Sequence, residues 1–181
     1  EIAFSGSKVL TGKALAADMF SFELIDADGD VIETVKNGAD GKFVFSAIKY
    51  ELADAGKTFT YTVKEVNDGK AGITYDEMVY TVTVEVKDAG DGTLTVTASD
   101  NATALDFTNT YAADGSVQFA GTKTLTGKAL AAEDFSFELI AEDGTVIETV
   151  KNDANGEFTF TAIKYELADI GTHTYTVKEV N

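Results

Sequence analysis

Short stretches in which large apolar side chains alternate with polar ones recur along the whole chain. They are rich in Phe, Tyr, Thr and Val, which favour strands, and Asp, Asn and Gly separate them. In one half of the chain they read FSFEL, DVIETV, KFVFSAI, TFTYTVKEV, YDEMVYTVTVEV, GTLTVTA and ALDFTNTY. Only ALAAD and YELAD hint at a helical turn. The pattern predicts an all-β fold, an immunoglobulin-like β-sandwich of about seven or eight strands.

The chain contains an internal repeat. FSGSKVLTGKALAADMFSFELI begins at Phe4 and returns as FAGTKTLTGKALAAEDFSFELI from Phe119. With one residue lost, the alignment continues until Asn67 meets Asn181, and most aligned positions are identical. We therefore expect tandem repeats: a complete domain over residues 1–111, a linker over 112–115 and a truncated second copy over 116–181. Residues 68–111 have no counterpart in that second copy.

Alternation also places polar side chains on faces that should be buried. In YTVKEV, Glu65 shares a strand face with apolar Tyr and Val, and the same letters return with Glu179 in that position. Lys8 and Asn109 fall in phase with apolar residues of the first and last predicted strands, although Val9 blurs the choice of face at Lys8. Buried polar groups are costly unless they are partnered. The pattern alone favours a buried Lys8–Glu65 ion pair, with the Asn109 amide capping an edge.

Composition narrows the functional classes. The 181 residues include 31 acidic and 14 basic side chains, and the net charge of −17 argues against nucleic acid or an anionic membrane as partner. The chain has no Cys, so neither disulfides nor thiolate metal sites are available. No apolar run approaches the length of a membrane span. No signal peptide is recognisable, which is typical of a mature segment or an excised fragment.

The remaining candidate sites are weak. DADGD (Asp26–Asp30) lacks the Gly and Glu that a calcium loop requires, and its counterpart AEDGT loses acidic residues, so a turn is the better interpretation. His173 is the only His and aligns with Phe59, which leaves neither a Ser–His triad nor a zinc cluster. Asn101 begins a glycosylation sequon that is too common to carry weight. No glycine-rich phosphate loop is present, and we expect no cofactor and no metal.

Six motifs closely resemble, in order, the pilin isopeptide-linkage repeat, an FctA-like, CnaB-type domain of Gram-positive pilins and adhesins. They are F-x-G-x-K-x-L-T-G-K, DFSFEL, YTVKEV, GITYD, YTVTVEV and DFTNTY. In that family a Lys on the first strand and an Asn on the last are joined by an amide bond, which a neighbouring Glu promotes. The resemblance implies Lys8 as nucleophile, Asn109 as electrophile and Glu65 as a buried acid that donates to the amide oxygen.

In the second copy the resemblance implies the same roles for Lys123 and Glu179, whose partner Asn would lie beyond Asn181. It further implies a structural stalk or shaft module on the cell-wall-anchored surface of a Gram-positive bacterium, and no enzyme. Adjacent repeats of the same protein would be its partners, and another domain would bind any host-surface ligand. Two other classes stay open. One is a ligand-binding adhesin domain, and the other is an engineered split isopeptide domain that awaits its missing strand.

Overall fold

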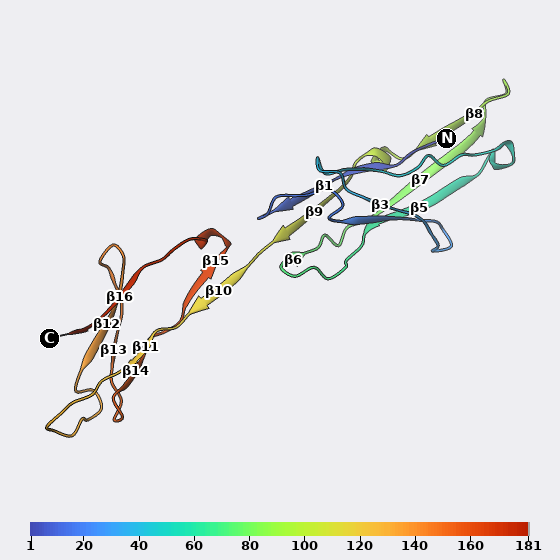
Figure 1. Cartoon of the computed structure of the whole chain (residues 1–181). Coiled ribbons are helices and arrows are strands. Elements are labelled where there is room, and N and C mark those ends of the chain that lie inside the picture. The colour runs from blue at the N-terminus through green and yellow to red at the C-terminus, as the bar shows by residue number, and fades with distance from the viewer. Residues whose placement is uncertain (181) are drawn as a thin grey trace. The chain divides into compact units, whose positions relative to one another are not determined.

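The computed structural model describes residues 1–180, and strands dominate it (Figure 1). Its chain divides into two compact units, Glu1–Ala112 and Ala113–Asn181. Within the described residues the only helical elements are three short 3-10 turns, η1 (Leu52–Asp54), η2 (Asp100–Thr103) and η3 (Leu167–Asp169). The all-β prediction is therefore confirmed. Of the two hinted helical turns, YELAD contains η1 in the first unit and η3 in the second, whereas ALAAD forms no helix.

The first unit is a sandwich of two sheets. One sheet has the order β4–β1–β9–β6, formed by β4 (Lys42–Val44), β1 (Ser5–Thr11), β9 (Leu105–Tyr111) and β6 (Ile73–Thr74). The other has the order β3–β2–β5–β7–β8, formed by β3 (Val31–Lys36), β2 (Ser21–Ile25), β5 (Thr58–Glu65), β7 (Val79–Asp88) and β8 (Leu94–Ala98). All the predicted strands are present. Only β6, which is too short to show alternation, was not predicted.

The inward faces of these two sheets form the core of the first unit. Alternate residues of β5, β7 and β9 are buried, as the period of two requires. Phe22 and Phe43 stack across the core with ring centroids 3.9 Å apart. The fully buried apolar side chains of this core include Phe4, Phe20, Phe22, Leu24, Phe45, Val63, Val82, Val84, Leu105 and Phe107. Lys8, Glu65 and Asn109 are buried among them.

The first and last strands of the first unit are neighbours in one sheet. β1 and β9 run parallel, with Lys8 opposite Phe107 and Leu10 opposite Asn109. Gly6 lets the strands and the core approach closely, because a Cβ there would lie 1.9 Å from the Leu105 carbonyl oxygen. Two segments about 100 residues apart in the sequence are thereby brought side by side.

The second unit has three small sheets. They are β13–β12–β16, from Val146–Lys151, Ser136–Ala141 and Tyr175–Val180; β11–β14, from Ala120–Thr122 and Glu157–Thr159; and β10–β15, from Asp114–Val117 and Ile163–Glu166. Its buried apolar core consists of Phe137, Leu139, Phe158 and Phe160. The predicted linker over 112–115 is partly wrong, because residues 114 and 115 belong to β10 and pair with Glu166 and Tyr165.

Replacing Gly6 tests the close approach of β1 to β9. We expect Gly6→Ala to destabilise the first unit by about 1–3 kcal/mol, because the clash is with backbone and no side-chain rotation relieves it. Gly121→Ala is the matched control, since the nearest atoms there belong to the Phe158 ring, which can shift. Hydrogen exchange measured on peptides of each unit reports both effects. Equal losses of protection in the two units would contradict this account.

The small core of the second unit predicts uneven resistance to proteases. We expect limited proteolysis of this chain at low concentration to cut first within residues 116–180, while residues 1–111 persist. The reason is that fewer apolar side chains are buried there, so local opening costs less free energy. Mass spectrometry of the fragments checks the order of cleavage. Uniform resistance would show that the strands present suffice for a stable unit.

Candidate functional site

Three strands of the first unit bring Lys8, Glu65 and Asn109 together. Lys8 projects from β1, Glu65 ends β5 and Asn109 lies on β9, each on a buried face of its strand. The Lys8 Nζ atom lies 2.7 Å from Glu65 Oε1, and both side chains are completely buried. Asn109 Nδ2 donates a hydrogen bond of 2.9 Å to the same oxygen. A single carboxylate oxygen therefore contacts both the amine and the amide nitrogen.

The other end of the Asn109 amide is held by the backbone. The N–H of Asp76 donates to Asn109 Oδ1 at 2.7 Å. Because a backbone N–H can only donate, the atom that it faces must be the amide oxygen, and this fixes the orientation of the group. Glu65 consequently faces the amide nitrogen. The expected contact between Glu65 and the amide oxygen is not made in this structure.

Burial moves both ionisable groups toward their neutral forms. Desolvation lowers the pKa of the Lys8 amine below its usual 10.5, and outweighs the opposite effect of the nearby Glu65 carboxyl. Desolvation likewise raises the pKa of Glu65 above 4.5, against the effects of Lys8, Asn109 and the Asp76 backbone N–H. Within residues 1–180, Lys8 Nζ makes no hydrogen bond of regular geometry despite its ion-pair distance from Glu65. Burial therefore acts on both groups in the same sense, toward loss of charge.

A shell of aromatic and loop residues encloses Lys8. Its Nζ lies 4.8 Å from the centroid of the Phe20 ring, and Tyr75 packs edge-on against that ring at 6.0 Å. Tyr75 and Lys70 both contact the Asp68 carboxylate. The segment 68–76 thus covers the site. The sequence alone predicted no role for this segment, although its last five residues, GITYD, are one of the motifs that carry the family resemblance.

The second unit brings Lys123 and Glu179 together without such a cover. Lys123 Nζ lies 2.6 Å from Glu179 Oε2 and 4.2 Å from the Phe135 ring, much as Lys8 lies near Phe20. The two side chains are nevertheless 21% and 34% exposed, whereas those of Lys8 and Glu65 are 0% exposed. In the first unit the cover of the pair comes from β9 and the segment 68–76.

Comparison with known families gives a match to the Spy0128-like isopeptide containing domain, FctA, over residues 4–112 and 119–181. The chain belongs to the FctA family. The match covers nearly all of both units, and the expected family resemblance is confirmed.

Several solved structures are similar to this FctA chain at low identity. The TIE protein of Bacillus anthracis shares 15% identity with a TM-score of 0.38, covering 99% of this chain and 28% of that chain. The Streptococcus pyogenes major pilin shares 14% with a TM-score of 0.44, covering 99% and 82%. The Lactobacillus rhamnosus GG shaft pilin SpaA shares 14% with a TM-score of 0.41, covering 99% and 86%. This chain thus spans just over a quarter of the TIE protein. Because these identities and TM-scores are low, the assignment to the FctA family rests on the match to the family.

No curated protein sequence matches the FctA chain significantly.

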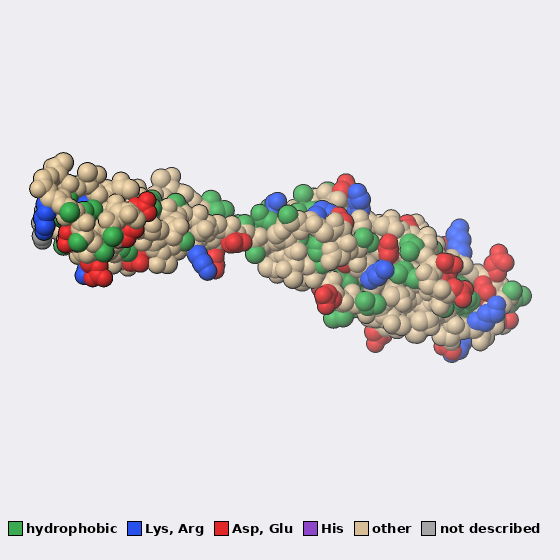
Figure 2. All heavy atoms as spheres, turned by 90° about the horizontal axis from the view of Figure 1, so that it is seen from below, with side chains coloured by type: hydrophobic (Ala, Val, Ile, Leu, Met, Phe, Trp, Pro, Cys, Tyr) green, Lys and Arg blue, Asp and Glu red, His purple; other side chains and the backbone are tan. Residues whose placement is uncertain are grey.

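The other candidates in the FctA chain have structural explanations. Asp26 accepts hydrogen bonds from the N–H groups of Asp28 and Asp30, so DADGD closes a turn, as expected. Asn101 lies in η2, and its side-chain Nδ2 donates to the Thr81 carbonyl oxygen of β7. In residues 1–180 no three His, Asp or Glu side chains cluster as metal ligands, and no helix there could cross a membrane. Acidic and basic side chains are interspersed on the face shown in Figure 2.

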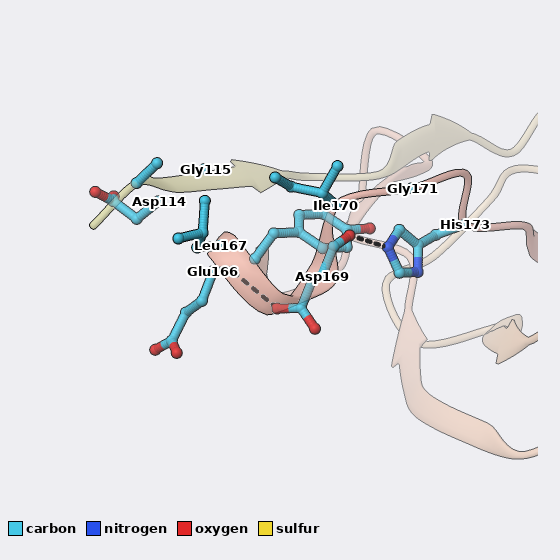
Figure 3. A pocket seen from close by; sticks show the side chains of 10 residues that line it. Asp114, Gly115, Glu166, Leu167, Asp169, Ile170, Gly171 and His173 are labelled. Carbon is cyan, nitrogen blue, oxygen red and sulfur yellow. Dashed lines mark hydrogen bonds between the residues drawn. The ribbon is translucent and has the colours of Figure 1, made fainter. Parts of the chain in front are cut away.

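One open hollow of about 430 Å³ in the second unit of the FctA chain lies beside η3 (Figure 3). His173 contacts the Asp169 carbonyl oxygen at its rim, 2.7 Å away. The hollow is lined by Ala113, Asp114, Gly115, Tyr165, Glu166, Leu167, Asp169, Ile170, Gly171 and His173. In the first unit a hollow also lies beside the matching turn η1, where it is bordered by the connection from β7 to β8.

Proposed function

We propose that the chain is a shaft or stalk module of a Gram-positive pilus or surface adhesin, locked by an amide bond between Lys8 Nζ and Asn109 Cγ. FctA membership supports the structural role. The observation that carries the proposal is the buried contact of one Glu65 oxygen with both the Lys8 amine and the Asn109 amide nitrogen. A purely structural ion pair needs no amide at that oxygen.

The contacts define a balanced reaction. The lone pair of neutral Lys8 Nζ attacks Asn109 Cγ, and the carbonyl π electrons move to Oδ1. Protonated Glu65 gives its proton to Nδ2, which leaves as ammonia when the C–N bond breaks. The resulting carboxylate takes a proton from the attacking nitrogen, so Glu65 ends as it began. Proximity replaces a bimolecular encounter, and the product stays in place, so the reaction happens once per molecule.

The strand arrangement gives this bond a mechanical purpose. Because β1 and β9 run parallel, tension that enters before β1 and leaves after β9 would shear one strand past the other. A Lys8–Asn109 bond would carry that tension directly, bypassing the residues between. By analogy with a disulfide, closing a loop of about 100 residues would also stabilise by roughly 4–5 kcal/mol.

The same proposal assigns roles to the second unit and to the partners of the chain. Lys123 and Glu179 take the roles of Lys8 and Glu65 when a strand that carries the Asn lies beside them. The partners are adjacent repeats of the same surface protein, anchored to the cell wall, and another domain contacts the host. The module itself uses no cofactor.

Intact mass tests the proposal. We expect the wild-type chain to weigh one ammonia less than its sequence predicts, and Glu65→Gln to fold but keep its full mass, because the amide cannot supply the proton. Glu23→Gln is the matched control, since Glu23 pairs with Lys64 at 3.3 Å on the same sheet without contacting the site. An unshifted wild-type mass, or normal ammonia loss in Glu65→Gln, would contradict the assigned chemistry.

The rate of ammonia loss should have a bell-shaped pH dependence. At low pH Lys8 becomes protonated and cannot attack, so the rate falls as pH drops through the lowered pKa of Lys8. At high pH Glu65 ionises and cannot protonate the leaving nitrogen, so the rate falls again above its raised pKa. Unlinked chain recovered in denaturant is diluted at each pH, quenched and weighed. A rate that rises steadily with pH would exclude Glu65 as the proton donor.

A further inference from the structure

The amide oxygen of Asn109 accepts a hydrogen bond from a backbone N–H to which the proposed reaction assigns no role. Attack at Cγ moves negative charge onto Oδ1, and Asp76 N–H already donates to this atom at 2.7 Å. Donors at this distance that are fixed before the reaction stabilise the developing charge at little reorganisation cost. Glu65 makes no such contact, because its Oε1 faces the amide nitrogen and its Oε2 has no hydrogen-bond partner among residues 1–180.

The Asp76 side chain explains why this N–H is held in place. Its Oδ2 accepts from the N–H of Thr108 at 2.7 Å, and its Oδ1 accepts from the N–H of Met78 at 2.9 Å. The first bond ties the loop to β9 at the residue next to Asn109. The second closes the loop on itself as an Asx turn. Donor and acceptor are therefore fixed to the same strand.

We propose that the Asp76 N–H stabilises the oxyanion formed on Asn109 Oδ1, and that the Asp76 carboxylate is the positioning group for that N–H. This role rests on the proposed amide-bond formation. The N–H is the catalytic group, since it touches a reacting atom. The carboxylate acts only through the loop that it closes.

The charge of Asp76 makes the test sharper. Its carboxylate opposes the loss of the proton from Lys8, because a nearby negative charge favours the ammonium form and raises the pKa of that amine. A purely electrostatic role therefore predicts that removing the charge speeds the reaction. A positioning role predicts that removing it slows the reaction, because the oxyanion donor is no longer fixed.

The experiment uses unlinked full-length chain, obtained by synthesis in denaturant so that it has never folded, and compares rates of ammonia loss after dilution, with samples quenched over time and weighed. We expect Asp76→Ala to react at least about tenfold more slowly than wild type, since a displacement near 1 Å can cost about 100-fold. Asp76→Asn removes the same charge but keeps one acceptor oxygen, so its rate should lie between those of Asp76→Ala and the wild type. Glu77→Ala is the matched control, because Glu77 is an exposed carboxylate of the same loop. It should react at the wild-type rate.

The outcomes separate the two proposals. A wild-type chain that loses no ammonia refutes the amide bond, and with it any oxyanion. If the wild-type chain loses ammonia, and Asp76→Ala and Asp76→Asn lose it at least as fast, the Asp76 role is refuted and the amide bond is not. Hydrogen exchange in a Glu65→Gln background, where no bond forms, verifies that each variant is folded. If Asp76→Ala does not fold, the Asp76→Asn rate against that of Glu77→Ala decides, with equal rates refuting the role.

Discussion

The first unit depends on keeping three polar side chains together in a place that excludes water. An isolated Lys, Glu or Asn between two apolar sheets would be costly, and here one Glu65 oxygen lies within contact of both the Lys8 amine and the Asn109 amide nitrogen. Their meeting requires β1 and β9 to be neighbours and Glu65 to end β5 opposite them. The sheet order, the closeness at Gly6 and the covering loop can all be understood as conditions for that meeting.

The two units show what the cover contributes. Both place a Lys and a Glu within ion-pair distance, over an aromatic ring. Only in the first unit is the pair withdrawn from solvent, because only there do β9 and the loop before β7 lie over it. Proximity of a Lys and a Glu is thus common to both units, and complete burial of the pair distinguishes the first. Under the proposed reaction that burial matters, because a protonated amine cannot attack an amide.

Alternation in the sequence predicts much of this arrangement. Periods of two located the strands and placed Glu65 and Asn109 inward, because one buried sheet face imposes that period on its residues. It could not reveal the role of Asp76, since that role belongs to a backbone N–H in a loop with no periodicity. The orientation of the Asn109 amide was also beyond prediction, because it depends on which donor arrives from elsewhere in the fold. The residues 114 and 115 were misjudged as linker for a similar reason, since β10 is defined by its pairing with β15 rather than by its own composition.

The parallel neighbours β1 and β9 have a consequence for how such a surface domain can vary. If tension passes from one to the other near Lys8 and Asn109, the turns and the outer faces between them contribute only to local folding. The exposed turn that follows β7, from Ala89 to Thr93, is one such region. Under the proposed shaft role, substitutions there would change the surface that an antibody encounters without weakening the path of tension. Strength and antigenic identity would then reside in different residues, so each could evolve without the other.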